Sequence, residues 1–137
     1  MTSKVFTDTN IIIDFLEQRE FDLELLNQLF YLAESRSLDL YVSESVITNA
    51  LYISKLPDQT LRLLNFINVI CIEKNVIQTA LGSTFIDKED AILYYGAFKN
   101  GMNCFLTRNK KHFDKYIKKE LPLYTVKEFF KVFYNDN

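Results

Sequence analysis

The sequence predicts an α/β fold: a mainly parallel sheet of four or five strands with helices on both faces. Short runs rich in strand-forming residues alternate along the chain with longer segments at helical spacing. The run at 69–72 is continuously apolar, as in strands that are buried on both faces. No linker-like stretch or repeat divides the 137 residues, so we expect a single domain over 1–137.

The first strand is expected at residues 4–8, an apolar run that stops at Asp8. Apolar side chains over 10–16, and again over 21–37, recur three and four residues apart, which predicts two helices. A second strand is expected at 38–42, because this run alternates and is rich in strand formers.

Helix-start residues mark the middle of the chain. Ser43 precedes helical spacing over 46–53, and Pro57 suits the first turn of a helix over 57–66. The apolar run at 69–72 is the third predicted strand.

The last part of the chain continues the alternation of helices and strands. A helix is expected over 74–83, and another over 87–99 that opens at Asp87 and is closed by Gly101. The remaining elements are expected to be strands at 103–107 and 123–125 and a helix at 126–134.

Asp8 is the first candidate functional residue, because it stands at the carboxyl end of a predicted strand. Ligands of open α/β sheets bind in the crevice outside those ends. Asn10 and Asp14, four residues apart, share one face of the helix that follows and are expected to support the site. Taken alone, Thr-Asp-Thr-Asn is better explained as a helix cap than as a metal site.

A second acidic cluster strengthens the case for a metal. Asp87, Glu89 and Asp90 fall in the first turn of the predicted late helix, where one acid would be explained by capping and by the helix dipole. Three acids in four residues repel one another, however. In combination with Asp8 they favour a cation site, and Mg²⁺ suits it because this hard ion prefers oxygen ligands.

Charge is unevenly distributed, although the net charge is only −2. Residues 1–44 hold nine acids and three bases, whereas 108–119 hold six bases and one acid. A basic segment of this kind can follow a phosphate backbone, although a solvated polar face is the more common explanation.

Cys71 and Cys104 lie in apolar runs that are typical of buried thiols, so neither a disulfide nor a zinc site is expected. The chain shows no signal-peptide pattern and no apolar run long enough to span a bilayer. A cytoplasmic protein without a membrane partner is therefore expected.

Four stretches of the chain together resemble the PIN-domain family, magnesium-dependent nucleases that include the toxin ribonucleases of bacterial toxin–antitoxin pairs. Each stretch is weakly specific alone, but their order and spacing match the family over nearly the whole chain. The stretches are VFTDTN at 5–10, VSESVITN at 42–49, DKEDA at 87–91 and FLTRN at 105–109.

The resemblance assigns roles to individual residues. Asp8 and Asp90 match two acids of the family, and Thr107 matches the hydroxyl residue that ends the fourth strand. Asn49 stands where most members have glutamate, and Asn109 where many have aspartate. The loss of two negative charges predicts weaker magnesium binding, for which Glu89 or Asp87 would compensate.

The resemblance implies hydrolysis of RNA phosphodiester bonds with Mg²⁺ or Mn²⁺ held mainly by Asp8 and Asp90. It also implies a homodimer and an antitoxin partner. A patch of Ile53, Leu56, Leu61 and Leu64 could serve dimerisation or equally belong to the core. RNA-binding residues are expected in the basic segment, at Arg108, Lys110, Lys111 and Lys115.

Two other classes of protein stay open. A PIN-fold module that binds RNA or protein, with weak or lost nuclease activity, would explain Asn49 and Asn109. A flavodoxin-like or receiver-like domain would also have acids at strand ends, but the third strand here lacks the expected aspartate. A nucleotide-binding Rossmann domain is disfavoured, because no glycine-rich turn follows the first strand.

Overall fold

The computed structural model describes residues 2–134, which contain a five-stranded sheet. Its strands are β1 (Lys4–Thr7), β2 (Asp39–Ser43), β3 (Asn68–Ile70), β4 (Cys104–Leu106) and β5 (Leu123–Tyr124). They lie in the order β3-β2-β1-β4-β5, and every neighbouring pair is parallel. The predicted α/β class with a parallel sheet is confirmed.

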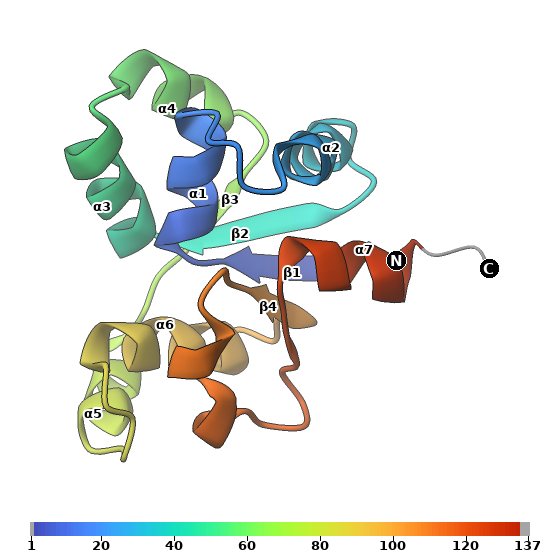
Figure 1. The fold of residues 1–137 in the computed structure, drawn as a ribbon. Helices are drawn as coiled ribbons and strands as arrows, with labels where there is room; N and C mark the ends of the chain where they lie inside the picture. Colours follow the sequence, from blue (N-terminus) through green and yellow to red (C-terminus); the bar gives the residue numbers. More distant parts are fainter. Residues whose placement is uncertain (1, 135–137) are drawn as a thin grey trace.

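Helices cover both faces of this sheet (Figure 1). Helices α1 to α4 and α7 form one layer, in which α1 contacts α2 and α3, and α2 contacts α7. Helices α5 and α6 pack together on the other face. Their bounds are Thr9–Leu16 for α1, Leu23–Glu34 for α2, Glu44–Ser54 for α3, Pro57–Leu63 for α4, Lys74–Leu81 for α5, Lys88–Lys99 for α6 and Val126–Phe133 for α7.

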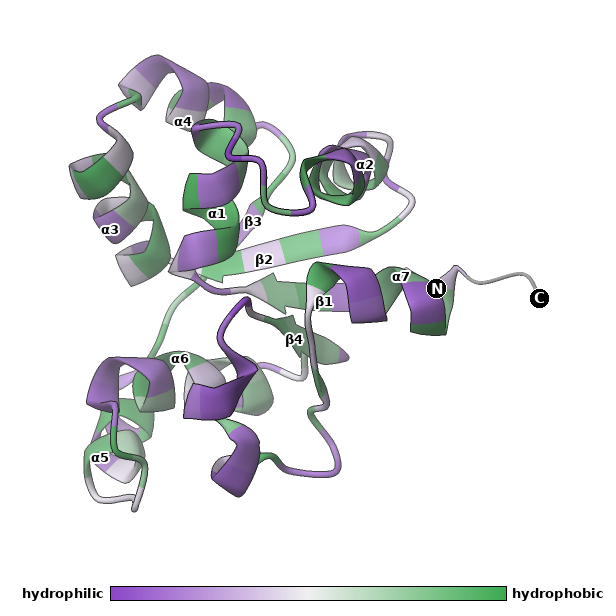
Figure 2. Cartoon of the chain, in the orientation of Figure 1, coloured by the Kyte–Doolittle hydropathy of each residue, from purple (hydrophilic) through white to green (hydrophobic). Residues whose placement is uncertain are grey.

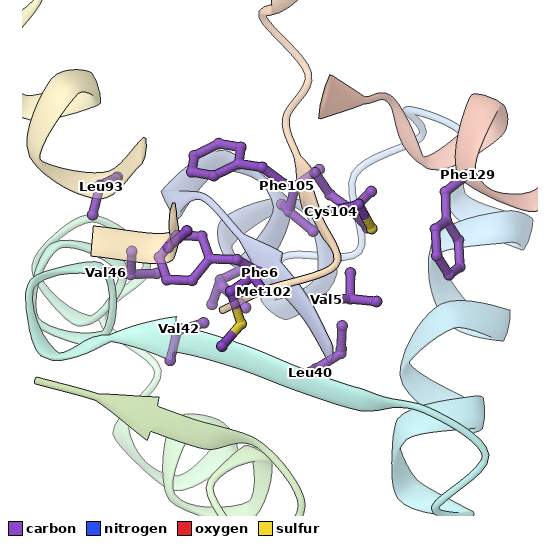
Figure 3. Packing of buried hydrophobic residues seen from close by; sticks show 14 of the residues in the cluster. Val5, Phe6, Leu40, Val42, Val46, Leu93, Met102, Cys104, Phe105 and Phe129 are labelled. Carbon is purple, nitrogen blue, oxygen red and sulfur yellow. The ribbon is translucent and has the colours of Figure 1, made fainter. Parts of the chain in front are cut away.

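The core lies between these layers and the sheet. Phe6 of β1 and Phe105 of β4 are fully buried and stack with ring centroids 5.1 Å apart (Figure 3). Val46 of α3 and Phe129 of α7 reach the core from the helical layer (Figure 3). β4 consists of hydrophobic residues, whereas hydrophilic residues prevail in the segment that follows it (Figure 2).

Polar side chains turn the chain from strand to helix at the carboxyl ends of the strands. Asp8 caps α1 by accepting the backbone N–H of Asn10 at 2.9 Å, and Ser43 caps α3 in the same way through Val46 at 3.3 Å. Thr125 and Glu128 form a complete capping box at the start of α7. The polar residues at these turns are therefore delivered to one edge of the sheet.

The structure corrects two details of the predicted pattern. The third strand ends at Ile70, so Cys71 follows it and is exposed, whereas Cys104 is buried in β4 as expected. The basic segment after β4, for which no helix was predicted, contains two short 3-10 helices, η1 (Lys110–His112) and η2 (Asp114–Tyr116). Within residues 2–134, no helix is long and apolar enough to cross a membrane.

One buried tyrosine attaches the end of the basic segment to α6. The Tyr94 hydroxyl donates to the Leu121 carbonyl at 2.7 Å and accepts the Lys118 N–H at 2.8 Å. Tyr94 is fully buried, so both backbone groups depend on this hydroxyl in a place where water does not replace it easily.

We therefore expect Tyr94→Phe to reduce the free energy of unfolding by about 1–3 kcal/mol, because two backbone groups lose their partner. Urea titration would measure the change. Tyr95→Phe is the matched control, since it removes a hydroxyl from the next residue of α6, which is only partly buried. An equal loss in both variants would show that the Tyr94 hydrogen bonds do not carry the effect.

Candidate active site

The carboxyl ends of β1 and β4 are joined by a short chain of hydrogen bonds. Thr107 Oγ1 donates to Asp8 Oδ2 at 2.6 Å, and the same oxygen accepts the backbone N–H of Asn109 at 3.1 Å. The Asp8 N–H donates to the Leu106 carbonyl at 3.1 Å. Asp8 is only 5% exposed, so these bonds hold its carboxylate in one orientation beside the sheet.

The first turn of α6 brings the second acidic cluster to the same edge. Asp87 caps the helix by accepting the Asp90 N–H at 3.0 Å. Asp90 faces the strand ends, and Glu89 Oε1 accepts a hydrogen bond from Asn49 Nδ2 of α3 at 3.3 Å.

A cavity of about 300 Å³ lies between these elements. It is the place where residues far apart in sequence meet, and it adjoins a larger cavity of about 640 Å³ through the shared residues Asn49 and Glu89. The smaller cavity is lined by Asp8, Thr9, Asn10, Asn49, Ile53, Glu89, Asp90 and Leu93.

Burial and repulsion both act on the two aspartates. Burial raises the pKa of Asp8 above its ordinary value, whereas the hydrogen bonds from Thr107 and Asn10 lower it by a smaller amount. The pKa of Asp90 is raised to about 6 by burial first and then by the charges of Asp87 and Asp8, against the opposing effect of His112. The charge of Asp8 thus acts directly on Asp90.

Several of the predicted site residues lie outside this cavity. Asp14 is 2% exposed and its Oδ1 accepts from Arg108 at 3.2 Å and from Arg19 at 3.5 Å. Burial raises the pKa of Asp14, and the two guanidinium groups oppose this rise. Asn109 and Asp87 are not among the residues that line the cavity.

The predicted RNA-binding residues fall into two groups. Arg108 is engaged with Asp14 and lies 5.0 Å from the centroid of the Phe21 ring, and Lys110 forms an ion pair with Glu128 at 3.0 Å. Lys111 and Lys115 are exposed and make no ion pair within residues 2–134. Of the four predicted RNA-binding residues, Lys111 and Lys115 are therefore the two whose charges face solvent without an ion-pair partner in the described part of the chain.

Two residues near the site were not predicted from the sequence. Thr9 lines the cavity, and its buried hydroxyl oxygen has no hydrogen-bond partner in the described part of the chain. His112, which is not among the predicted site residues, has a side chain that is 56% exposed and places Nδ1 3.3 Å from Asp90 Oδ2. Neither position carries a sequence signal, because both depend on how distant segments meet.

The donor set fits a hard divalent cation. Asp8, Asp90 and Glu89 offer carboxylate oxygens, and Asn49 offers an amide oxygen. Oxygen ligands of this kind suit Mg²⁺, which commonly keeps several waters and needs only one or two carboxylates from the protein.

The fold and this constellation of strand-end and helix-start acids define the class of the protein. A family model described as PIN domain matches residues 4–111. The chain therefore belongs to the PIN-domain family, as the resemblance of its motifs predicted.

Individual relatives are similar over nearly their whole length. The chain is 24% identical over 139 aligned positions to Ribonuclease VapC1 of Aquifex aeolicus (strain VF5), which covers 93% of this chain and 94% of that protein. Among solved structures, a toxin–antitoxin complex from Klebsiella pneumoniae matches with a TM-score of 0.64 and 23% identity, covering 85% of this chain and 94% of that one.

VapBC2 from Rickettsia felis, bound to a DNA fragment from its promoter, matches with a TM-score of 0.62 and 18% identity, covering 89% of this chain and 98% of that one. At such identities the structural likeness establishes a common fold.

The raised pKa of Asp90 predicts a pH-dependent stability in the absence of divalent metal. Because the pKa of Asp90 is about 6 in the folded state and 3.8 in its ordinary state, the folded protein holds this proton more tightly than the unfolded chain does. The stability that the proton provides is complete below pH 3.8 and is lost as pH rises through about 6. Asp90→Asn should therefore match the parent near pH 4 and exceed it by about 1–2 kcal/mol at pH 7.5. Chemical unfolding with chelator at both pH values measures this difference.

Asp58→Asn provides the control, because Asp58 also lies in the first turn of a helix, α4, but is exposed. This control separates loss of the helix dipole interaction from relief of repulsion at the site. A stability difference between parent and Asp90→Asn that stays constant from pH 4 to pH 7.5 would contradict the assignment.

Proposed function

We propose that the protein is a divalent-metal-dependent endoribonuclease that hydrolyses RNA phosphodiester bonds and acts as the toxin of a toxin–antitoxin pair. The observation that carries the proposal is the cavity in which Asp8 and Asp90 meet and repel each other. The relative from Aquifex aeolicus, which is named a ribonuclease, supports the activity. The toxin–antitoxin complexes of similar fold support the biological role.

Asp8 and Asp90 would be the principal ligands of Mg²⁺ or Mn²⁺, with Glu89 and Asn49 beside them. The ion would supply charge neutralisation at the phosphate and a lowered pKa for the attacking water. Thr107 orients Asp8 through the 2.6 Å hydrogen bond and keeps its Oδ2 from turning away. Asn10, at the N-terminal end of α1, lines the same cavity and would position the scissile phosphate.

A weaker nuclease that mainly binds RNA or protein is the second candidate function. Asn49 uses its amide to donate to Glu89, so the position adds no negative charge of its own and ties up one carboxylate oxygen. Asn109 does not line the cavity either. Both observations predict a lower affinity for Mg²⁺ than a site with four carboxylates would have.

The proposed toxin would act together with other protein chains. We infer a homodimer, for which Ile53, Leu61 and Leu64 offer exposed apolar surface while Leu56 is half-buried. An antitoxin protein is the second expected partner. The chain would act as one domain over 1–137 in the cytoplasm.

RNA cleavage should need Mg²⁺ or Mn²⁺ and stop with chelator. Asp8→Asn and Asp90→Asn should each lower the cleavage rate by more than about a hundredfold, because loss of partners that merely support metal ligands already lowers activity by 10–100-fold. Asn49→Glu should raise the rate or lower the Mg²⁺ concentration that is required. A fluorescent RNA substrate with purified, contaminant-free protein measures all three.

Thr48→Glu is the control for added charge, since it lies one residue earlier on α3, about 100° around the helix, and does not line the cavity of Asp8. Melting curves confirm that each variant is folded. Cleavage that persists in both folded aspartate variants would remove Asp8 and Asp90 from the mechanism.

RNA binding, measured with chelator, should separate the two groups of basic residues. Lys111→Ala and Lys115→Ala should each weaken binding and reduce the slope of log K against log salt by about 0.7, without a change in melting temperature. Arg108→Ala should instead lower stability by about 1–3 kcal/mol, because buried Asp14 loses its nearer partner. Lys131→Ala, on exposed α7 surface, is the control. An Arg108 variant with parental stability would contradict the structural role.

A further inference from the structure

A histidine stands beside the acidic cluster of α6. One donor atom from each of Asp87, Asp90 and His112 lies within 4.8 Å of the other two. His112 Nδ1 approaches Asp90 Oδ2 to 3.3 Å. Asp90 is also one of the oxygen donors that line the cavity of Asp8, whereas Asp87 and His112 do not line it. The trio therefore borders the proposed nuclease site and shares one residue with it.

The position of His112 is set by its buried neighbour in the chain. Phe113 is 1% exposed and packs against Phe105 and Phe85, with ring centroids 5.2 and 5.8 Å apart. The His112 backbone N–H donates to the Asn109 carbonyl at 3.2 Å. The backbone of η1 is thereby anchored, while the imidazole itself extends toward the start of α6.

The cluster still has side-chain atoms that are free to bind an ion. Asp87 uses Oδ1 to cap α6, which leaves Oδ2 available, and the cap keeps the side chain at the cluster. Ligands about 2.1 Å from one ion lie roughly 3 to 4.2 Å from each other, so a separation of up to 4.8 Å closes with small side-chain rotations. Asp87 and His112 are exposed and can make them.

An imidazole nitrogen changes which ion is preferred. Mg²⁺ favours oxygen ligands, whereas imidazole nitrogen suits later first-row ions such as Zn²⁺, Fe²⁺ and Ni²⁺, and Mn²⁺ accepts it beside oxygen ligands. His112 also supplies a donor without adding a negative charge to a cluster in which Asp87 and Asp8 already raise the pKa of Asp90.

We propose that Asp87, Asp90 and His112 form a metal site that takes first-row transition ions such as Mn²⁺ in preference to Mg²⁺. The site shares Asp90 with the cavity of Asp8. The inference rests on the proposed function in one respect, since it names the ion that would serve the nuclease. The binding of metal at His112 can be measured without any RNA.

The chain contains one histidine, so its imidazole is a reporter free of overlap. In ¹⁵N-detected spectra of the labelled full chain, diamagnetic Zn²⁺ should move the Nδ1 resonance to the range of a metal-bound nitrogen while Nε2 keeps its proton. Mg²⁺ at the same concentration should leave Nδ1 unbound. An Nδ1 resonance that Zn²⁺ does not move would overturn the proposal.

Calorimetric titration with MnCl₂ and MgCl₂ tests selectivity. His112→Gln should weaken Mn²⁺ binding by at least about tenfold and change Mg²⁺ binding by less than about twofold. Asp87→Asn, which keeps a good helix cap, should also weaken Mn²⁺ binding. Lys111→Gln is the matched control in the same 3-10 helix and should change neither. Parental Mn²⁺ affinity in His112→Gln would overturn the proposal.

The two proposals fail in different ways. If His112→Gln loses Mn²⁺ affinity but the parent cuts no RNA with any ion, the metal site stands and the nuclease function fails. If the parent cuts RNA and His112→Gln binds Mn²⁺ as well as the parent does, the nuclease function stands and the His112 site fails. Melting curves for every variant exclude unfolding as the cause.

Discussion

The buried hydrogen bond from Thr107 Oγ1 to Asp8 Oδ2, 2.6 Å long, is the contact on which the site depends. It joins the ends of two neighbouring strands and orients the carboxylate that also caps α1. The Thr107 hydroxyl has one proton, and directing it at Asp8 leaves its oxygen to accept the N–H of Asn109. The position of Asp8, the start of α1 and the path of the segment after β4 are therefore fixed together.

Two buried aspartates near α1 illustrate two uses of the same residue type. Asp14 is compensated by Arg108 and Arg19 and acts as a structural anchor between α1 and the end of β4. Asp8 receives hydrogen bonds and faces Asp90, but it forms no ion pair within residues 2–134, and the pKa values of both aspartates are raised. A group left in this state lowers the stability of the protein until a cation or a proton neutralises it.

The sequence predicted what local rules govern. Strand-end and capping preferences place Asp8 and Asp90, and alternation of helices and strands places the sheet. It could not predict contacts between distant segments, such as Arg108 with Asp14 or His112 with Asp90. Which acid of α6 enters the cavity depends on helix rotation, which packing decides. Cys71 proved exposed because a strand expected to continue ended one residue before it.

The strand order has a consequence for synthesis of the protein. β1 is central, and one of its two neighbours, β4, is made almost a hundred residues later. An emerging chain can pair β1 with β2 early, but Thr107, the hydrogen-bond partner of Asp8, is made 99 residues after it. The nascent chain on the ribosome is therefore unable to assemble the acidic pocket until β4 has emerged, so the first strand pair forms before the site does.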